Sequence, residues 1–584
     1  MVHRFLAPCV GALLLVAATS VVCRASETSP APEVAAAAPS VASPAASTPL
    51  VEAVRERVDH LRYDEQQDAR GARIVLDGPV ARFYESRQFQ PVWQDPARVD
   101  ALVAALAGLV DDGLDPSDYH LEALRSFRLD VRMGTPLTAT DRADLELVAT
   151  DALMLAAYHL YLGKVDPHQL SPQWNFAERP LEVERGIATL AQRLATGQVA
   201  EILEAARPQH VWYQRGRERL AEYRAIAAAG GWPALGEGPT LRPGMSDPRV
   251  PVLRRRLAIT HDLPSATVDA TPAGDGATAL DAALYDGALE AAVKGFQARH
   301  GLTPDGVVGA GTRQALDVPV AARIDQIRVN LERGRWTLHE IHGDFVLVDV
   351  AGFYVSYFRD DEPVWTSKVV VGRDQRETPV FRSTITYVVF NPTWTIPPGI
   401  LVKDKLPELR RNAGALKRMH IRVLDGSGRE VDPYAIDWHR YGANRLPPYQ
   451  FRQDPGPDNA LGRVKIMFPN PYLVYLHDSP AKSLYEQDQR TFSSGCIRVQ
   501  HPMELARLVL DDPAWDAAAI DAAVARGETR TVNLKQPVPV LILYWTAQPR
   551  PDGQVIFRGD IYGRDAPLLA ALDGEYRRPT TTPR

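Results

Sequence analysis

The chain has 584 residues, of which 45% are hydrophobic and 24% charged, and its formal net charge is −6. This length exceeds what one hydrophobic core supports and suffices for about three or four domains. The mildly acidic balance disfavours a non-specific nucleic-acid-binding protein, because such proteins present a basic surface.

The N-terminus has the pattern of an export signal. A short basic start precedes an apolar run over residues 5–22, and Ala25 is a small residue suited to a cleavage site. We therefore expect a signal peptide over residues 1–25 and a periplasmic protein. An uncleaved inner-membrane anchor is the alternative, although the run is marginal against the ~20 residues that a span needs. A lipoprotein anchor at Cys23 is disfavoured, because a valine precedes it where a small residue is required.

Export also changes the interpretation of the cysteines. The chain contains Cys9, Cys23 and Cys496, and only Cys496 remains if cleavage follows Ala25. A single cysteine cannot form an internal disulfide, so in an oxidising compartment it is either buried and inert or functional. The residues around Cys496 must decide between these two.

A linker and a helical region follow. Residues 26–50 consist almost entirely of Ala, Pro, Ser, Thr and Val, which predicts a disordered linker. Residues 51–235 predict a helical scaffold domain, because apolar residues recur at helical spacing over 99–110, 141–162 and 215–229. No later stretch is expected to span a membrane. The aromatic side chains expected in the core are Phe83, Tyr84, Phe89 and Trp93, whereas His120, His159 and His168 lack metal-ligand spacing.

Residues 240–318 change in character. They predict three short helices joined by glycine turns, with Val250, Leu253 and Leu257 on one face and Leu289, Val293 and Phe296 on another. Asp305, Gly306 and Gly309 are turn residues, and Thr312 is expected to cap the last helix. The order AVKGFQ, GL, DGVVG and T resembles the three-helix peptidoglycan-binding module of cell-wall enzymes. A generic three-helix spacer is the alternative.

The C-terminal half has the alternation of β-strands. Short runs rich in Val, Ile, Tyr and Phe predict strands at 345–350, 353–358, 368–371, 385–390, 464–468, 473–477 and 538–544. We place a β-rich domain at 325–570, with a helix-and-loop insertion at 401–460 that suits a lid. Residues 571–584 are expected to form a disordered tail. The predicted fold class is therefore multidomain α+β.

The segment after residue 472 carries the chemistry. His477 ends an alternating strand and is the only histidine before the thiol in this segment, and Cys496 follows a Ser-Ser-Gly loop. A thiol is mostly protonated at neutral pH, so attack on an amide requires a base or a lowered pKa. Gly495 permits a sharp turn, which points the amides of Ser494, Gly495 and Cys496 at a developing oxyanion.

The whole string resembles a known active-site motif. Ser493, Gly495, Cys496 and Arg498 match the YkuD-type L,D-transpeptidases, in which a His precedes Ser-His-Gly-Cys and an Arg or Asn follows. Ser494 departs from the commoner histidine, which is not the general base of the family. The Ser-Ser-Gly-Cys form resembles the large subgroup with an N-terminal scaffold and a capping insertion, and the segments 391–397 and 451–462 look like that subgroup too.

The resemblance implies a reaction. Cys496 is then the nucleophile and His477 the general base and acid, with the oxyanion held by the amides of Ser494, Gly495 and Cys496. The enzyme attacks a tetrapeptide stem, releases D-Ala, keeps the stem as a thioester and transfers it to a second stem as a 3→3 cross-link. No metal or other cofactor is implied, and carbapenems are expected to acylate the thiol. The expected substrate-binding residues are Arg498, Ser493, Trp394 and Tyr475.

Two alternatives stay open from the residues alone. Water in place of the acceptor amine gives an L,D-carboxypeptidase, and a protein without catalysis is a peptidoglycan-binding scaffold. Ser479 and Lys482 spell the S-x-x-K motif of penicillin-binding enzymes, but the chain lacks the S-D-N and K-T-G triplets that accompany it. The implied partners are peptidoglycan stem peptides and glycan strands, together with other wall-synthesis enzymes.

Overall fold

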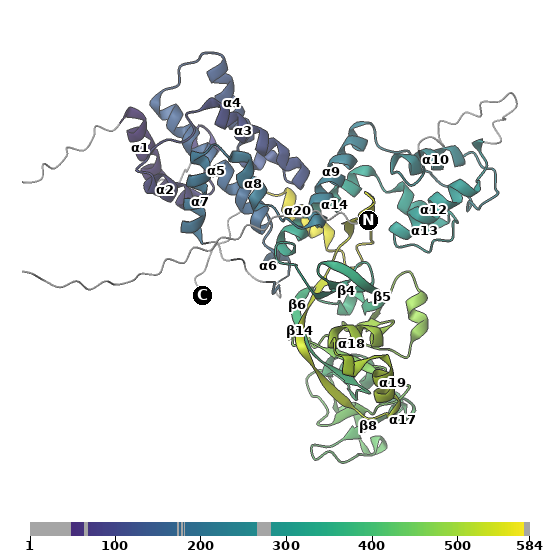
Figure 1. The fold of residues 1–584 in the computed structure, drawn as a ribbon. Helices are drawn as coiled ribbons and strands as arrows, with labels where there is room; N and C mark the ends of the chain where they lie inside the picture. Colours follow the sequence, from purple (N-terminus) through teal and green to yellow (C-terminus); the bar gives the residue numbers. More distant parts are fainter. Residues whose placement is uncertain are drawn as a thin grey trace, which may run out of the picture. The chain divides into compact units, whose positions relative to one another are not determined.

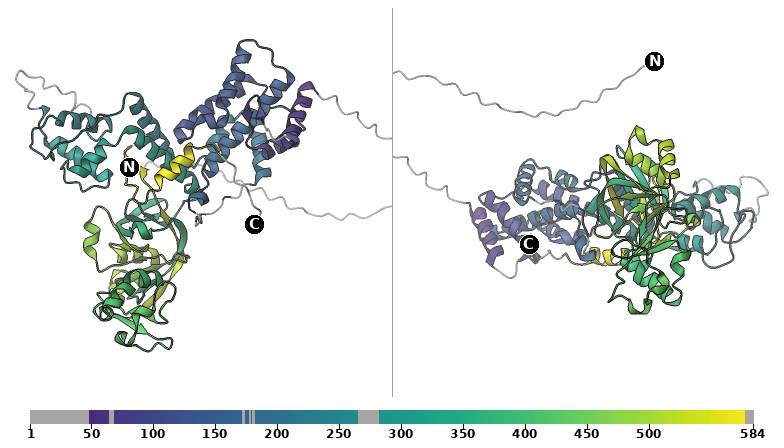
Figure 2. Two further views of the ribbon diagram at one scale, coloured as in Figure 1. Left: turned by 180° about the vertical axis from the view of Figure 1, so that it is seen from behind. Right: turned by 90° about the horizontal axis from the view of Figure 1, so that it is seen from below.

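The structure is a computed structural model, and it describes residues 48–63, 68–171, 174–176, 179, 182–264 and 282–576. The predicted signal peptide, the cysteines within it and most of the predicted linker lie outside the described residues. The described residues from Pro49 onward belong to one unit. Figure 1 and both views in Figure 2 show helices in the purple-to-blue part of the chain and strands in the green-to-yellow part, as the multidomain α+β prediction requires.

Helices build the N-terminal region. Their bounds are α1 Pro49–Tyr63, α2 Asp77–Ser86, α3 Pro96–Ala107, α4 Leu121–Arg132, α5 Ala139–Leu162, α6 Pro167–Leu170, α7 Val183–Ala195, α8 Val199–Ala206 and α9 Val211–Ala228. A short hairpin, β1 Asp68–Ala69 with β2 Ala72–Arg73, follows α1. Helix α5 runs through the core, and its capping box at Thr138 and Asp141 fixes where it begins. Phe83, Tyr84 and Trp93 are buried in this core as expected.

The expectation that no later stretch suits a membrane was wrong for α5. Among the described residues, α5 is the one helix long and apolar enough to cross a bilayer, but 72% of its apolar window is buried inside the protein. Burial on nearly all sides explains the apolar sequence, since a helix that is hydrophobic all round is a core helix as readily as a membrane span.

Two predicted boundaries also need correction. Helix α1 begins at Pro49, inside the predicted linker, because its apolar face packs on α5. Helix α20, Asp565–Asp573, occupies the start of the predicted disordered tail. Its Leu568 and Leu572 are buried in the core of the N-terminal helices, and the yellow α20 lies beside those helices in Figures 1 and 2. The C-terminal segment therefore returns to complete the first domain.

The middle region forms the three predicted helices, α10 Val250–Ile259, α12 Gly287–Arg299 and α13 Ala310–Asp317. Their apolar faces share one core. The predicted cap at Thr312 is wrong, because Gly309 is the N-cap and makes no side-chain bond. The Thr312 hydroxyl is instead buried within the helix and accepts a hydrogen bond of 3.1 Å from the Gln297 side chain.

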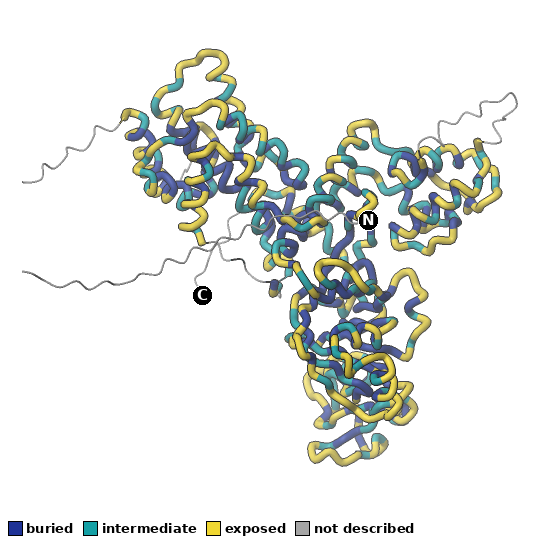
Figure 3. The backbone as a smooth tube through the Cα atoms, in the orientation of Figure 1, coloured by how far each residue is buried: buried dark blue, intermediate teal, exposed yellow. Residues whose placement is uncertain are grey.

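A nine-stranded sheet dominates the C-terminal half. Its strands are β3 Phe345–Asp349, β4 Tyr354–Arg359, β5 Glu362–Gly372, β6 Phe381–Phe390, β10 Val464–Met467, β11 Leu476–His477, β12 Thr491–Ser493, β13 Ile497–Val499 and β14 Arg530–Leu543. They are ordered β12-β5-β13-β11-β10-β6-β14-β3-β4, and a further pairing between β5 and β4 closes the sheet on itself. A separate hairpin pairs β15 Ala547–Pro549 with β16 Val555–Phe557. Figure 3 shows dark-blue buried backbone along these strands and yellow exposed backbone at the loops.

Two helices, together with the alternation of side chains along the strands, determine which side chains of the sheet are buried. Helices α18 Pro502–Leu510 and α19 Ala517–Ala525 pack on the sheet and share its core with alternate residues of the strands. The predicted strand at 473–477 begins only at Leu476, because Leu473 adopts a left-handed backbone with a φ of 57°. That irregular segment lies directly before the histidine of interest.

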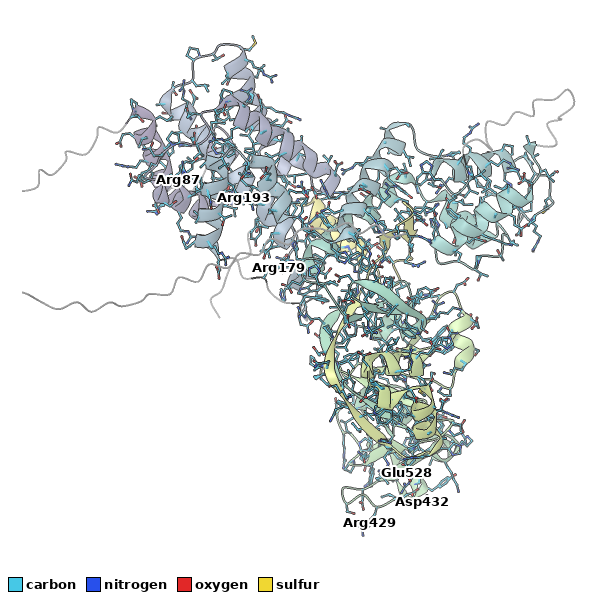
Figure 4. All side chains as sticks on the ribbon, viewed as in Figure 1. Arg87, Arg179, Arg193, Arg429, Asp432 and Glu528 are labelled. Atoms are coloured by element: carbon cyan, nitrogen blue, oxygen red, sulfur yellow. The ribbon has the colours of Figure 1, made fainter. Side chains whose placement is uncertain are left out.

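The predicted insertion has a core of its own. It contains α15 Pro398–Ile400, the π-helical turn η5 Leu401–Lys405, α16 Leu406–Arg411 and α17 Ala415–Arg418, with the sheet β7 Trp394–Thr395, β9 Gln450–Gln453 and β8 Ile421–Leu424. The insertion begins before residue 401, because β7 belongs to its sheet and pairs with β9. Arg429 and Asp432 mark it in Figure 4.

Helix α14, Val320–Thr337, is joined to the helical region by a buried charge network. Arg335 donates to Glu332 and, at 2.7 Å, to the Asp112 carbonyl, and neither Arg335 nor Glu332 is exposed at all. The Asp112 carboxylate in turn accepts a hydrogen bond from Arg207 at 2.9 Å. Each buried cation here is compensated by a carboxylate, as burial of charge requires.

Candidate active site

Strand pairing brings five side chains onto one face of the sheet. His477 on β11 is paired with Lys465 on β10 and with Arg498 on β13. Paired residues on neighbouring strands point to the same face, as do residues two apart along a strand. Tyr475 and Cys496 lie just before β11 and β13 and are hydrogen-bonded to each other, and the Tyr475 ring contacts both Lys465 and His477. We call Lys465, Tyr475, His477, Cys496 and Arg498 the active face.

The Cys496 thiol is half-buried at the end of the active face. It donates a hydrogen bond of 3.6 Å to the carbonyl oxygen of Leu473, in the irregular segment before β11. Burial raises the pKa of Cys496 and is the largest effect, while hydrogen bonds from the Tyr475 backbone and hydroxyl and the charges of Lys465 and Arg498 lower it. The resting thiol is therefore protonated, with donors and cations placed to stabilise the thiolate once it forms.

The tautomer of His477 follows from its hydrogen bond. Nδ1 lies 2.5 Å from the backbone carbonyl oxygen of Asp478. A carbonyl oxygen only accepts, so Nδ1 carries the proton and Nε2 keeps a lone pair. Burial, with Arg498 as the next largest cause, lowers the pKa of His477 to about 3. The imidazole is neutral at pH 7 and is set to accept a proton through Nε2.

Two residues that we did not predict hold the histidine in place. Asp478 is buried, and its carboxylate accepts a hydrogen bond from the Arg463 amide at 2.9 Å and another from Lys482 at 2.5 Å. Gly462 lies against it, and a Cβ there would stand 2.4 Å from the Asp478 carboxyl group. The segment 451–462 had indicated only a family resemblance, whereas the contact shows why position 462 needs a glycine.

The nucleophile loop contradicts part of the predicted oxyanion hole. The Gly495 amide donates to the Ser493 hydroxyl at 3.0 Å, so it is not available to an oxyanion in this structure. The Ser493 hydroxyl also donates to the Cys496 carbonyl at 2.6 Å, and Ser493 is 2% exposed. The prediction of Ser493 as a substrate-binding residue is therefore wrong, because the side chain braces the loop from inside. The φ of Gly495 is 111°, a conformation that favours glycine.

Lys465 and Arg498 are the half-buried cations of the active face. Among the described residues, neither has an ion-pair partner, and the only side-chain group that raises the pKa of Lys465 is Cys496. The ammonium of Lys465 lies 3.8 Å from the centre of the Tyr475 ring. A lysine within the otherwise apolar strand 464–468 was the sequence signal for this residue, and we did not use it.

Ser494 connects the nucleophile loop to the insertion. Its hydroxyl accepts a hydrogen bond of 2.8 Å from Arg376, which also forms two hydrogen bonds of 2.6 Å to Asp404 of η5. Arg373 approaches the same hydroxyl at 3.4 Å. The position where the resemblance expects a histidine is thus occupied by the acceptor of an arginine from the loop after β5.

The remaining predicted residues lie elsewhere. Trp394 packs on the core of the insertion. Among the described residues, no contact joins it to the active face. Ser479 is buried, and its hydroxyl accepts from the Ala481 amide at 3.2 Å rather than meeting Lys482, so the S-x-x-K reading gains no support. Within the described part of the chain, no group of three or more His, Cys, Asp or Glu side chains is placed to hold a metal.

Comparisons with known proteins agree in domain order. The family model "Scaffold domain" matches residues 78–220, "Putative peptidoglycan binding domain" matches residues 273–316, and "L,D-transpeptidase catalytic domain" matches residues 343–540. A "Putative L,D-transpeptidase" of Haemophilus influenzae is 32% identical over 246 residues, covering 42% of this chain. The match covers 49% of that relative, so the chain spans about half its length.

A solved L,D-transpeptidase from Xylanimonas cellulosilytica is 16% identical, with 53% of this chain and 99% of that chain covered. Its TM-score of 0.17 is too low to support a structural argument.

Proposed function

We propose that this chain, which carries a scaffold domain, a peptidoglycan-binding module and a YkuD-type L,D-transpeptidase catalytic domain, forms 3→3 cross-links in peptidoglycan through a thioester at Cys496. The observation that carries the proposal is the shared face of Cys496 and His477, with the imidazole held in the tautomer that accepts a proton.

Acylation uses this pair directly. The Cys496 proton moves to Nε2 of His477, and the sulfur attacks the carbonyl carbon between residue three and the terminal D-Ala of a tetrapeptide stem. When the tetrahedral intermediate collapses, His477 returns the proton to the departing D-Ala nitrogen. The amide bond is broken, the thioester is formed, and no proton is gained or lost.

The second half-reaction reverses the roles. An acceptor amine from another stem loses a proton to Nε2 of His477 and attacks the thioester carbonyl. Collapse expels the Cys496 sulfur, which recovers the proton from the imidazole. The new amide is the 3→3 cross-link, and the energy of the first peptide bond is carried by the thioester, so no nucleotide is consumed.

The oxyanion hole contains fewer amide donors than the sequence implied. Because Gly495 donates to Ser493, we assign the oxyanion to the amides of Ser494 and Cys496, for which no partner is found among the described residues. Arg498 and Lys465 add positive potential at the thiolate and at the peptide's carboxylates.

The other domains suit the same substrate. The peptidoglycan-binding module would hold glycan strands near the catalytic domain, and the N-terminal export pattern would place the enzyme in the periplasm. Carbapenems would acylate Cys496, because they present a reactive carbonyl to the same thiol.

Product analysis tests the proposal. Purified mature protein is incubated with disaccharide-tetrapeptides, and the products are analysed by mass spectrometry. Dimers formed with loss of one D-Ala support transfer, whereas tripeptide monomers alone would mean that water resolves the thioester. If neither forms while a Cys496→Ala variant binds sacculi as well as the wild type, the chain acts as a wall-binding scaffold.

A further inference from the structure

Two arginines and one carboxylate meet beside the nucleophile loop. Arg376 binds both oxygens of Asp404 at 2.6 Å, and Arg373 lies 3.7 Å from the same carboxylate. Both arginines approach the Ser494 hydroxyl, two residues from Cys496. We call Arg373, Arg376 and Ser494 the guanidinium pair site.

The site is held rigidly on the side of the catalytic sheet. The loop that carries both arginines leaves β5 at Gly372, where a Cβ would stand 2.1 Å from the Arg376 carbonyl oxygen. The buried Thr378 then ties this loop to the nucleophile loop, because its hydroxyl donates to the Gly495 carbonyl at 2.9 Å. The arginines are therefore fixed relative to Cys496.

Asp404 comes from a different element. It lies on η5 of the insertion, which packs on the insertion's own core, and the Asp404 side chain is 32% exposed. Partly exposed ion pairs contribute little to stability, so this contact can be exchanged for another carboxylate. Two guanidinium groups for one carboxylate leave an excess positive charge beside the active face.

We propose that the guanidinium pair site is the receptor for the terminal carboxylate of the donor stem, and that Asp404 occupies it as an intramolecular substitute when no donor is bound. The proposal rests on the function above. The fork of Arg376 fits any carboxylate in the same two-bond geometry. The terminal carboxylate is separated from the scissile carbonyl by one residue only, so it must lie near Cys496.

This assignment has two consequences of opposite sign. Removing the charge of Asp404 removes the competitor, so donors with a free carboxylate bind more tightly. Removing Arg376 removes the receptor, so the same donors bind more weakly. A contact that only latches the insertion predicts instead that both changes act in the same direction, since each breaks the same ion pair.

Binding is measured in a Cys496→Ala background, which prevents turnover. The ligands are a disaccharide-tetrapeptide and the same compound with its terminal carboxyl amidated. We expect Asp404→Asn to lower the Kd of the free acid about threefold or more, and Arg376→Gln to raise it about tenfold, with little change for the amide. Asp425→Asn, which breaks an Arg429 ion pair inside the insertion, is the matched control and should change neither Kd.

The receptor role would be contradicted if the Cys496→Ala background protein bound the acid and the amide equally. It would also be contradicted if Asp404→Asn and Arg376→Gln shifted the Kd of the free acid in the same direction. Release of D-Ala is assayed separately with Cys496 intact. If D-Ala release is lost while the affinities shift as expected, the proposed reaction is wrong and the receptor role is retained. If D-Ala release is normal while the affinities do not shift, the receptor role is wrong and the proposed reaction is retained.

Discussion

Two sets of arginines and lysines in this chain differ in whether a carboxylate neutralises their charge. At the junction of α14 with the helical region, Arg335 is fully buried and bonded to Glu332, and Arg207 is bonded to Asp112. On the active face, Lys465 and Arg498 are half-buried without an ion-pair partner among the described residues. At the junction the buried cations are neutralised by carboxylates, whereas on the active face two cations remain available to a thiolate and to anionic peptides.

The largest effect should come from breaking the compensated set. Arg335→Met leaves the carboxylate of Glu332 buried without its cation, and we expect a loss of about 3–5 kcal/mol of stability because an unpaired buried charge is costly. The readout is the midpoint of thermal unfolding, with activity per folded molecule unchanged. Adding Glu332→Gln should recover part of the loss, and failure to do so would contradict the charge argument.

Removing an uncompensated cation should act on chemistry instead. Lys465→Met is expected to slow alkylation of Cys496 at neutral pH about tenfold, because one unit of pKa changes the thiolate fraction tenfold. Stability should be unchanged or improved, since a half-buried charge is removed. Lys535→Met, at an exposed lysine paired with Asp512, is the control and should leave the rate unaltered. A loss of stability without a change in rate would give Lys465 a structural role.

The pH dependence of that alkylation sharpens the comparison. Burial raises the pKa of Cys496, so the iodoacetamide rate should keep rising with pH beyond the range of an exposed cysteine. The midpoint should lie higher still in Lys465→Met. A rate that reaches its plateau below pH 7 would mean a resting thiolate–imidazolium pair and would refute the neutral pair described above.

The last effect is confined to acid pH and concerns stability. The folded pKa of His477 is about 3, against roughly 6.5 for an unperturbed histidine, so between these values the unfolded chain binds more protons. The stability that the neutral His477 contributes to the folded state is therefore complete above about pH 6.5 and is lost as the pH falls toward 3. His477→Gln should make the decline of the unfolding midpoint across this window shallower. An unchanged slope would show that this imidazole is not buried in its neutral form.

The sequence predicted the architecture well because apolar periodicity and motif order are local. It predicted the three regions, most strands of the sheet and the insertion, but it misplaced the C-terminal boundary. The return of Leu568 and Leu572 to the N-terminal core is a long-range contact that no local pattern records.

The candidate site was predicted in part, for the same reason. The motif predicts Cys496 and His477 as the reacting pair, and this stays a prediction. The internal hydrogen bonds of Ser493 and of the Gly495 amide depend on the three-dimensional turn of the loop. Lys465 joins the face only through the pairing of β10 with β11, and Arg376 reaches Ser494 across a chain separation of 118 residues.

The most direct test of the central claim is the mass of the intact protein after brief incubation with disaccharide-tetrapeptide. A thioester at Cys496 predicts an adduct equal to the disaccharide-tripeptide acyl group, located on the peptide that contains Cys496 and absent from Cys496→Ala. Product formation by the alanine variant, or an adduct on any other residue, would contradict the account.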